Sequence, residues 1–518
     1  MTSSSSRRSA APSRNPRPGA QAHRPRAATG PQAVHLAPDS LGFALDQAAQ
    51  AVGAVRAGAA LPAALTSVFA ALPADSATLA RGAVQDIAYR TMRRLGLVDW
   101  LLRQRVSKAP PQPVANLMAC ALALLVDDEA NAAYAPFTVV DQAVRAVGAR
   151  REMAFAKGLV NAVLRGFLRE REALLAAARA DEVAHWNYPQ WWIDATRAAW
   201  PGEWQSILAA GNTHGPLTLR VNARRTTAAD YLVRLRAADI DAVQIGDHAV
   251  RLAAPLPVDR IPGFMAGDVS VQDAGAQVAA QHLGVRDGMR VLDACAAPGG
   301  KSGHLLELAD IDLIALESDA ARAARIGENF ERLGFTQDDP AHPLRRARVV
   351  IGDAGAAGDS AAWYDGQPFD RILADVPCSA SGIVRRHPDI RWLRRQGDIA
   401  ALAKEQRRIV AALWPLLKPG GELLYVTCSI FPEEGEAAAR WFESSHPDAV
   451  RLGAPGQLLP TAGHAPSGEA GGDADCEADN GAASKAQPDA SGNDADHAAV
   501  PRRTADHDGF FYARFQKR

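Results

Sequence analysis

The sequence has few cysteines and no long apolar run. Only five of its 518 residues are cysteine, and none of them forms a Cys-x-x-Cys motif or a Cys/His cluster. This scarcity argues against a disulfide framework and against a metal site. The longest nearly unbroken apolar run, 117–126, has ten residues, whereas a membrane-spanning helix needs about twenty. No charged-then-apolar leader opens the sequence, so we expect a cytoplasmic protein with reduced thiols and no membrane segment.

The composition is that of a globular enzyme, with 47% hydrophobic and 22% charged residues, and the length suggests about three domains. The formal net charge is −1, so no global field attracts nucleic acid. The charge is nevertheless unevenly distributed. Residues 1–38 contain six arginines and no acid, whereas residues 456–507 carry nine acids against three bases. Neither segment can bury enough apolar surface to fold, which predicts a disordered basic arm and a disordered acidic insertion.

Three folded regions are expected between these segments. In residues 39–184, apolar residues at spacings of three and four predict a helical bundle with 117–126 as its central helix. Residues 185–268 combine helical patterns with strand-like runs, which predicts a small α+β domain. From 269 to 518, strands alternate with helices, which predicts a doubly wound parallel sheet with ligands at the carboxyl ends of its strands. The predicted strands are 289–294, 312–317, 347–353, 370–375, 422–428 and 509–515.

The first of these strands runs into a loop of small residues, Asp-Ala-Cys-Ala-Ala-Pro-Gly-Gly-Lys-Ser at 293–302. Such a loop lets the backbone approach a ligand closely at the start of a helix. The absence of Gly-x-Gly-x-x-Gly disfavours a dinucleotide. The loop matches the phosphate-binding P-loop motif, Gly-x-x-x-x-Gly-Lys-Ser/Thr, except that Cys295 replaces the first glycine. An NTPase therefore remains an alternative. The candidate cofactor contacts are Cys295, Ala296, Ala297, Pro298, Gly299, Gly300 and Lys301.

Acidic residues end the strands that follow this loop. Glu317 ends the second strand, where a carboxylate can bind the two hydroxyls of a ribose. Asp353 ends the third strand, where it can accept from an adenine amine, and Asp375 ends the fourth. Three acids would repel a triphosphate but suit a cationic cofactor that lacks phosphates. The pattern therefore predicts S-adenosylmethionine.

Two cysteines, Cys378 and Cys428, follow strands at the same edge. Carbon 5 of a pyrimidine is too weak a nucleophile to take a methyl group directly. A thiolate that adds to carbon 6 makes carbon 5 enamine-like, and a base afterwards removes the carbon 5 proton as the thiol is expelled. Asp375 is placed to hydrogen-bond ring nitrogen 3. The two cysteines thus predict pyrimidine carbon 5 methylation, although their spacing does not decide which one attacks.

A dense basic segment follows the Cys378 loop directly. Its arginines and histidine predict a grip on RNA phosphates beside a pocket that accepts an extruded base. Phosphate contacts carry no sequence information, so we expect the helical and α+β domains to sense RNA shape. The predicted RNA contacts are Arg385, Arg386, His387, Arg391, Arg394 and Arg395.

The motifs at 295–301, 377–382 and 427–429, together with the basic segment 385–395, resemble the Sun (Fmu-type) RNA cytosine-5 methyltransferases. The resemblance covers nearly all of the chain outside the arm and the insertion. It implies a helical RNA-binding domain of the NusB type and a Rossmann-like methyltransferase domain that uses S-adenosylmethionine. Glu317 stands where the family more often has Asp, and Val376 replaces the usual Ala.

The resemblance also implies roles and a substrate. Cys428 would be the nucleophile, and Cys378 would assist release by helping to remove the carbon 5 proton. The substrate would be a cytosine in small-subunit (16S) ribosomal RNA, naked or early in assembly, and the enzyme would act as a monomer. Transfer RNA or another ribosomal cytosine is the alternative substrate. A non-enzymatic RNA-binding or transcription factor is the alternative protein class.

Overall fold

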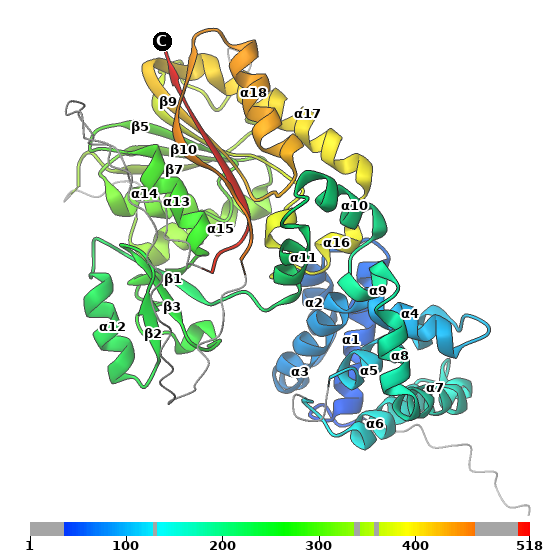
Figure 1. The fold of residues 1–518 in the computed structure, drawn as a ribbon. Coiled ribbons are helices and arrows are strands. Elements are labelled where there is room, and N and C mark those ends of the chain that lie inside the picture. Colours follow the sequence, from blue (N-terminus) through cyan, green and yellow to red (C-terminus); the bar gives the residue numbers. More distant parts are fainter. Residues whose placement is uncertain (1–35, 128–131, 336–341, 357–361, 462–505) are drawn as a thin grey trace, which may run out of the picture.

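The computed structural model describes most of the chain, and Figure 1 shows a helical bundle, a small sheet and a large sheet. The predicted basic arm, 1–38, and the predicted acidic insertion, 456–507, lie almost wholly outside the described residues. No helix in the described part of the chain is both long and apolar enough to cross a membrane. The described residues are 36–127, 132–335, 342–356, 362–461 and 506–518.

The helical bundle is built around α5 (Gln112–Leu125). Ten apolar side chains of α5 are buried, including Cys120, because neighbouring helices cover it on all sides. This confirms the predicted central helix. The helices around it are α1 (Leu41–Arg56), α2 (Leu61–Ala70), α3 (Ala74–Arg93), α4 (Leu95–Arg105), α6 (Pro136–Ala149), α7 (Lys157–Arg169), α8 (Arg171–Ala178) and α9 (Glu182–Trp186).

Two tryptophan-rich helices, α10 (Gln190–Ala199) and α11 (Trp204–Asn212), join the bundle to the large sheet. Trp192 is fully buried and packs with Val384 and Phe431 of the large-sheet domain. The tryptophans are therefore core residues, as their helical spacing indicates. These helices also pack on the large-sheet domain, with which they share one apolar cluster.

The small domain is a four-stranded antiparallel sheet in the order β2-β3-β1-β4, with α12 packed against it. Strand β4 pairs with β1, so this sheet extends beyond the predicted boundary at 268. Its elements are β1 (Thr218–Val221), α12 (Ala228–Ala237), β2 (Ala242–Gln244), β3 (Ala249–Leu252) and β4 (Val269–Val271).

The large sheet has the order β10-β11-β9-β8-β5-β6-β7. Its strands from β9 to β7 are parallel, which confirms the doubly wound core, but β11 runs antiparallel to both β9 and β10. Strand β10 was not predicted, because its half-exposed edge position leaves no apolar pattern. The strands are β5 (Arg290–Ala294), β6 (Asp312–Glu317), β7 (Arg346–Ile351), β8 (Phe369–Asp375), β9 (Leu417–Thr427), β10 (Ala449–Leu458) and β11 (Phe510–Lys517).

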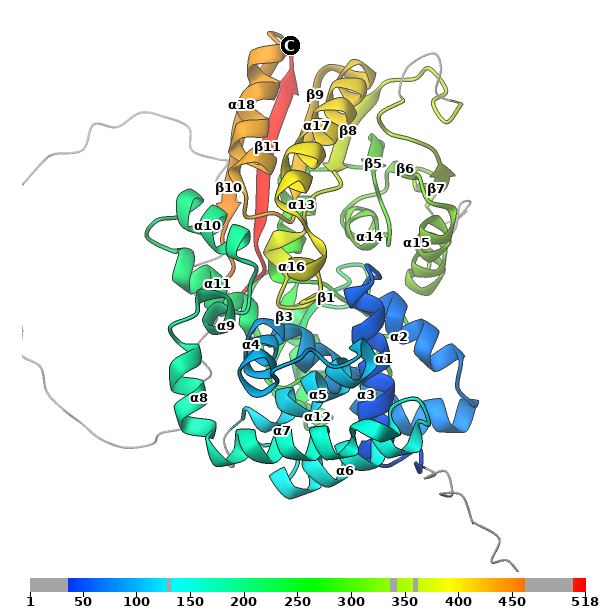
Figure 2. The same ribbon diagram turned by 90° about the vertical axis from the view of Figure 1, so that its right-hand side faces the viewer.

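Helices cover both faces of this sheet. One face packs against α13 (Ala274–Leu283), α14 (Gly300–Leu308) and α15 (Ala320–Leu333). The other packs against α17 (Gln396–Leu413) and α18 (Glu436–Ser445). The short helix α16 (Ile390–Leu393) lies between the large sheet and the helical bundle (Figure 2).

The basic segment around α16 connects domains instead of forming an exposed basic surface. Arg385 is 1% exposed and pairs with Asp506 and Asp508, while its carbonyl accepts a hydrogen bond from Arg93 of the bundle. Arg386 pairs with Asp508 and with Asp273 at 2.8 Å. Arg385 is neutralised inside the protein, which corrects the expected phosphate grip for this residue, whereas Arg386 is paired but half-buried.

Arg391 is fully buried and acts at the same interface. Its guanidinium lies 3.9 Å from the ring centroid of Tyr188 and donates to the carbonyls of Gly211 (2.7 Å) and Asn187 (3.2 Å). The prediction that Arg391 faces RNA is therefore also wrong. A buried arginine of this kind donates hydrogen bonds to carbonyls that have no backbone partner in a helix or a sheet.

The remaining members of the segment differ in exposure. Arg394 donates to the carbonyls of Ser379 (3.1 Å) and Cys378 (3.3 Å), so it supports the Cys378 loop. His387 is half-buried. Only Arg395 among the six predicted contacts is exposed. The segment thus carries its charge mostly for internal contacts.

We expect Arg391→Met to destabilise the protein markedly. The substitution leaves at least two buried carbonyls without donors, and each orphaned group costs about 1–3 kcal/mol. The midpoint of the first thermal transition should fall by several degrees. Arg395→Met, in the same segment but exposed, should change stability by no more than about 0.5 kcal/mol. Equal midpoints for the two variants would contradict the interface role.

Candidate active site

Four loops meet at one edge of the large sheet. Strand β5 lies between β6 and β8, and β9 lies on the other side of β8, all parallel. Their carboxyl ends therefore share an edge. The topology places the cofactor loop after β5, Glu317 at the end of β6, Asp375 and Cys378 after β8, and Cys428 after β9.

The loop after β5 folds back onto the end of β6. The backbone N–H groups of Cys295 and Ala296 both donate to the Leu316 carbonyl at 2.9 Å. Gly299 has a φ of +90°, and a Cβ there would lie 3.1 Å from a methyl carbon of Ile326, so only glycine fits. Helix α14 begins at Gly300. The loop thus presents backbone, with little side-chain bulk, at a helix N-terminus.

Glu317 is held in place by this loop. Its carboxylate is 2% exposed and accepts from the N–H groups of Asp319 (3.1 Å) and Ala297 (3.3 Å) and from Arg322 (3.3 Å). Asp353 lies in a more open position, where it accepts from Arg408 at 3.0 Å. The hydrogen bond from Arg408 lowers the pKa of Asp353.

Three carboxylates, Glu317, Asp353 and Asp375, lie at or just after the ends of neighbouring strands. Such acceptors would repel a nucleoside triphosphate and suit a cationic cofactor. Ser302, which a P-loop would use as a magnesium ligand, is buried and donates its hydroxyl to Asp293. The P-loop alternative is therefore disfavoured by the local geometry.

Lys301 forms an ion pair with Asp375, with 2.6 Å between Nζ and Oδ2. Burial alone would lower the pKa of Lys301, but the negative charge and hydrogen bond of Asp375 outweigh it and raise the pKa. The ammonium group therefore stays charged.

The Sγ atoms of Cys378 and Cys428 are 3.3 Å apart. The hydrogen bond to Cys428, and then burial, raises the pKa of Cys378 well above its ordinary value. Cys378 is therefore a thiol that can donate to its neighbour. Burial also raises the pKa of Cys295, and it raises the pKa of Cys120 to about 12, so neither is placed to act as a thiolate.

Comparison with known proteins agrees with this geometry. The family model described as 16S rRNA methyltransferase RsmB/F matches residues 280–516, and the ferredoxin-like domain of RsmF/B-like methyltransferases matches 188–259. A protein called ribosomal RNA small subunit methyltransferase B from Sodalis glossinidius is 43% identical over 394 residues, which cover 74% of this chain and 86% of the relative.

The protein of the same name from Pseudomonas syringae pv. tomato is 40% identical over 395 residues, which cover 75% of this chain and 83% of the relative. The chain belongs to the RsmB/F methyltransferase family. The crystal structure of PH0851 has the same fold, with a TM-score of 0.64 and 22% identity over 93% of this chain and 99% of that one.

This RsmB/F family member has two buried acids that the sequence analysis missed. Asp293, 1% exposed, is the penultimate residue of β5, so the rule that selected Glu317 as an acid ending a strand passes over it. Glu434, fully buried, lies in the turn after Cys428 (Pro432–Glu434) and contacts the serines that follow both cysteines. No sequence pattern distinguishes Glu434 from its neighbour Glu433.

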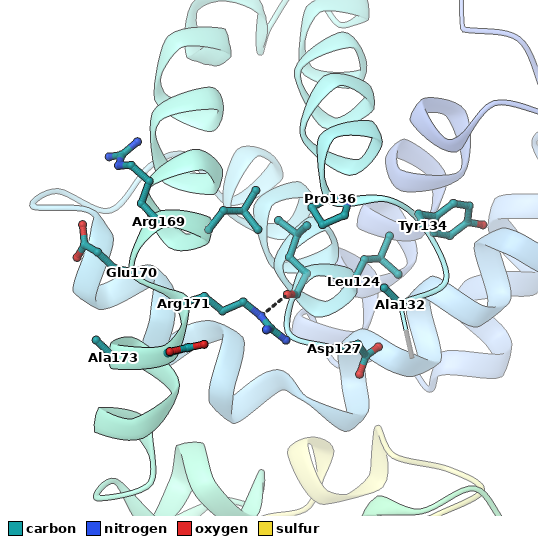
Figure 3. A pocket seen from close by; sticks show the side chains of 12 residues that line it. Leu124, Asp127, Ala132, Tyr134, Pro136, Arg169, Glu170, Arg171 and Ala173 are labelled. Atoms are coloured by element: carbon teal, nitrogen blue, oxygen red, sulfur yellow. Dashed lines mark hydrogen bonds between the residues drawn. The ribbon is translucent and has the colours of Figure 1, made fainter. Parts of the chain in front are cut away.

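A separate pocket of about 690 Å³ lies in the helical bundle, at the end of α5 and the junction of α7 and α8 (Figure 3). None of the predicted site residues lines it. Arg171 in this pocket donates to the carbonyls of Leu125 (3.3 Å) and Val126 (2.9 Å), so its hydrogen bonds link the start of α8 to the end of α5. No cysteine is among the described residues that line this pocket.

Asp293 predicts a pH-dependent stability for this RsmB/F family member. Burial raises the pKa of Asp293 from 3.8 to about 7. Between these values the folded state keeps a proton that the unfolded state has lost, so stability falls as pH rises through this window. Asp293→Asn removes this loss, which is on the order of a few kcal/mol.

The measurement is the thermal midpoint of wild type and variant at several pH values between 4 and 8. We expect the variant to gain on the wild type up to about pH 7 and to keep a constant advantage above it. Asp259→Asn, at an exposed position, should follow the wild-type curve throughout. A constant offset between wild type and Asp293→Asn would contradict the assigned titration.

Proposed function

We propose that this chain uses S-adenosylmethionine to methylate carbon 5 of a cytosine in 16S ribosomal RNA, through a covalent adduct with Cys428. The observation that carries the proposal is the 3.3 Å contact between Cys378 and Cys428 at the sheet edge that also holds the cofactor loop. The names of the relatives, which are ribosomal RNA small subunit methyltransferases, support the substrate class.

S-adenosylmethionine would supply an electrophilic methyl group. The backbone of residues 295–301 would hold it at the start of α14, Glu317 would bind the ribose hydroxyls, and Asp353 would accept from the adenine amine. The charge on Asp353 is favoured by Arg408, so it remains an acceptor at neutral pH.

The first step belongs to Cys428. Its thiolate adds to carbon 6 of the cytosine, which pushes electron density to carbon 5 and lets that carbon attack the methyl group. The Cys378 thiol can donate to the Cys428 sulfur. As the adduct forms, nitrogen 3 would take a proton from solvent water, Asp375 would accept a hydrogen bond from the resulting N–H, and this proton would return to solvent when the Cys428 thiolate is expelled.

The second step belongs to Cys378. After methyl transfer, carbon 5 carries both a methyl group and a hydrogen. Removal of that proton returns its electron pair to the ring, re-forms the double bond between carbons 5 and 6, and expels Cys428 as a thiolate. The main cause of the raised Cys378 pKa is its hydrogen bond to Cys428. Because this bond is lost once the Cys428 sulfur is bonded to carbon 6, Cys378 would release its proton to solvent more readily, and the resulting thiolate would take the carbon 5 proton.

Single-cysteine variants test this division of roles. Cys378→Ala should accumulate an RNA–protein adduct that survives a denaturing gel, because release is blocked. Cys428→Ala should give no adduct. Nucleoside mass spectrometry of naked, unmethylated small-subunit RNA should detect 5-methylcytidine with wild type and none with Cys428→Ala. Equal loss of adduct in both variants would overturn the assignment, and product on transfer RNA alone would favour the alternative substrate.

An exposed basic row on α7 is the candidate RNA surface of the helical domain. Lys157, Arg165 and Arg169 recur at multiples of four residues, so they project from one side of the helix. All three are exposed, and none forms an ion pair with a described residue. Phe155, 72% exposed, lies just before the helix and could stack on a base. We propose that this row contacts RNA phosphates.

Charge reversal tests the α7 row. The triple variant Lys157→Glu, Arg165→Glu, Arg169→Glu should bind RNA more weakly and lower the slope of log affinity against log salt by about two. The variant Lys157→Arg, Arg165→Lys, Arg169→Lys keeps the charge and should bind as wild type does. The salt dependence is measured by filter binding with small-subunit RNA. An unchanged slope in the reversed variant would exclude the row from the interface.

A further inference from the structure

The two cysteine loops leave the backbone ladder before they reach the cysteines. The last backbone hydrogen bond that continues the β8–β9 pairing runs from the Val376 N–H to the Val426 carbonyl, at 3.2 Å. The next backbone contact between the loops joins the Gly382 N–H to the Cys428 carbonyl at 2.9 Å. Residues 377–381 therefore have no backbone partner in the neighbouring loop. Something else must fix Cys378 relative to Cys428.

The carboxylate of Glu434 lies between these loops and is fully buried. It accepts from the Ser379 N–H at 2.8 Å and from the Ser379 hydroxyl. It also accepts from the Ser429 hydroxyl at 2.6 Å and from the Gln406 amide at 3.1 Å. Ser379 follows Cys378 and Ser429 follows Cys428, so one carboxylate holds the residue after each cysteine.

The same network reaches the other side of Cys378. Gln406 of α17 donates to the Pro377 carbonyl at 3.0 Å as well as to Glu434. The turn that carries Glu434 is itself fixed to β9, because the Glu434 carbonyl accepts from the hydroxyls of Tyr425 (2.8 Å) and Thr427 (3.1 Å). Both neighbours of Cys378 and the strand before Cys428 are thus tied to one residue.

A carboxylate accepts all four of these hydrogen bonds. Four donors converge on Glu434, and an ionised carboxylate offers about four acceptor sites. An amide of the same shape accepts on one atom only, so the hydroxyls of Ser379 and Ser429 would have to turn and accept from its NH₂ group, which rearranges their other hydrogen bonds. Burying a charge is costly unless hydrogen bonds replace its water, which these four donors do.

We propose that Glu434 is a positioning residue that sets the distance between the Cys378 and Cys428 sulfurs. The role rests on the proposed function, in which one sulfur attacks and the other assists release from the same ring. Glu434 touches neither the substrate nor the reacting atoms. It acts through Ser379 and Ser429.

The test compares Glu434→Gln with Glu433→Gln, its exposed neighbour. The first readout needs no RNA. In a glutathione buffer, one oxidised glutathione takes two electrons and two protons from the thiol pair, which leaves a Cys378–Cys428 disulfide and two reduced glutathione molecules. Peptide mapping gives the disulfide fraction and hence the effective concentration of one thiol at the other. We expect Glu434→Gln to lower it by about tenfold and Glu433→Gln to leave it unchanged.

The second readout is methyl transfer. In Glu434→Gln the kcat should fall while the KM for S-adenosylmethionine stays at the wild-type value, because the cofactor loop is untouched. A wild-type protein that makes no 5-methylcytidine on any RNA would refute the proposed function, and the thiol measurement would still decide the positioning role. Wild-type effective concentration in Glu434→Gln would overturn the inference.

A third variant protects the test against misfolding. Ser429→Ala removes one donor and leaves the carboxylate in place with its other partners. If Glu434→Gln yields no folded protein, Ser429→Ala decides the matter by the same thiol measurement. We expect a smaller fall, of about threefold, in the effective concentration. A value equal to wild type would count against the positioning role.

Discussion

Backbone groups that leave a sheet but stay buried need new hydrogen-bond partners, and this constraint shapes the whole site. The loops after β5, β8 and β9 all leave the ladder at one edge. Charged side chains supply hydrogen bonds to these loops. Glu317 accepts from the cofactor loop, Arg394 donates to the Cys378 carbonyl, and Glu434 accepts from the serine after each cysteine. The geometry of the cysteines depends on these charges as much as on the sheet.

The same constraint joins the helical bundle to the catalytic domain. Arg391 satisfies two carbonyls at the junction, and the Leu61 N–H donates to Asp389 at 2.8 Å across it. Trp392 donates its indole N–H to the Met92 carbonyl at 2.9 Å. The bundle is therefore attached directly beside the Cys378 loop. A surface on the bundle that orients RNA would act at a fixed distance from the reacting sulfurs.

Much of the catalytic domain could be predicted, because parallel strands are short apolar runs and their carboxyl ends share an edge. The predicted 312–317 coincides with β6, and the cysteines fall together as expected. The basic segment was misjudged for a physical reason. A sequence shows which residues are charged but not which residues they pair with. Arg385 pairs with Asp508, which lies 123 positions away along the chain. Glu434 was missed likewise, because its burial depends on Ser379, 55 positions away.

The junction of β10 and β11 has a further consequence. Arg385 donates to the Thr461 carbonyl at 3.2 Å and also pairs with Asp506, so a single guanidinium ties together the two ends of the connection between these strands. The connection between 461 and 506 therefore begins and ends at the Arg385 side chain. Each doubling of a flexible loop costs only about 0.6 kcal/mol, so the length of this connection is nearly free to vary. The fold thus contains a natural insertion point at which sequence can grow or shrink while the sheet, the cysteines and the cofactor loop keep their places.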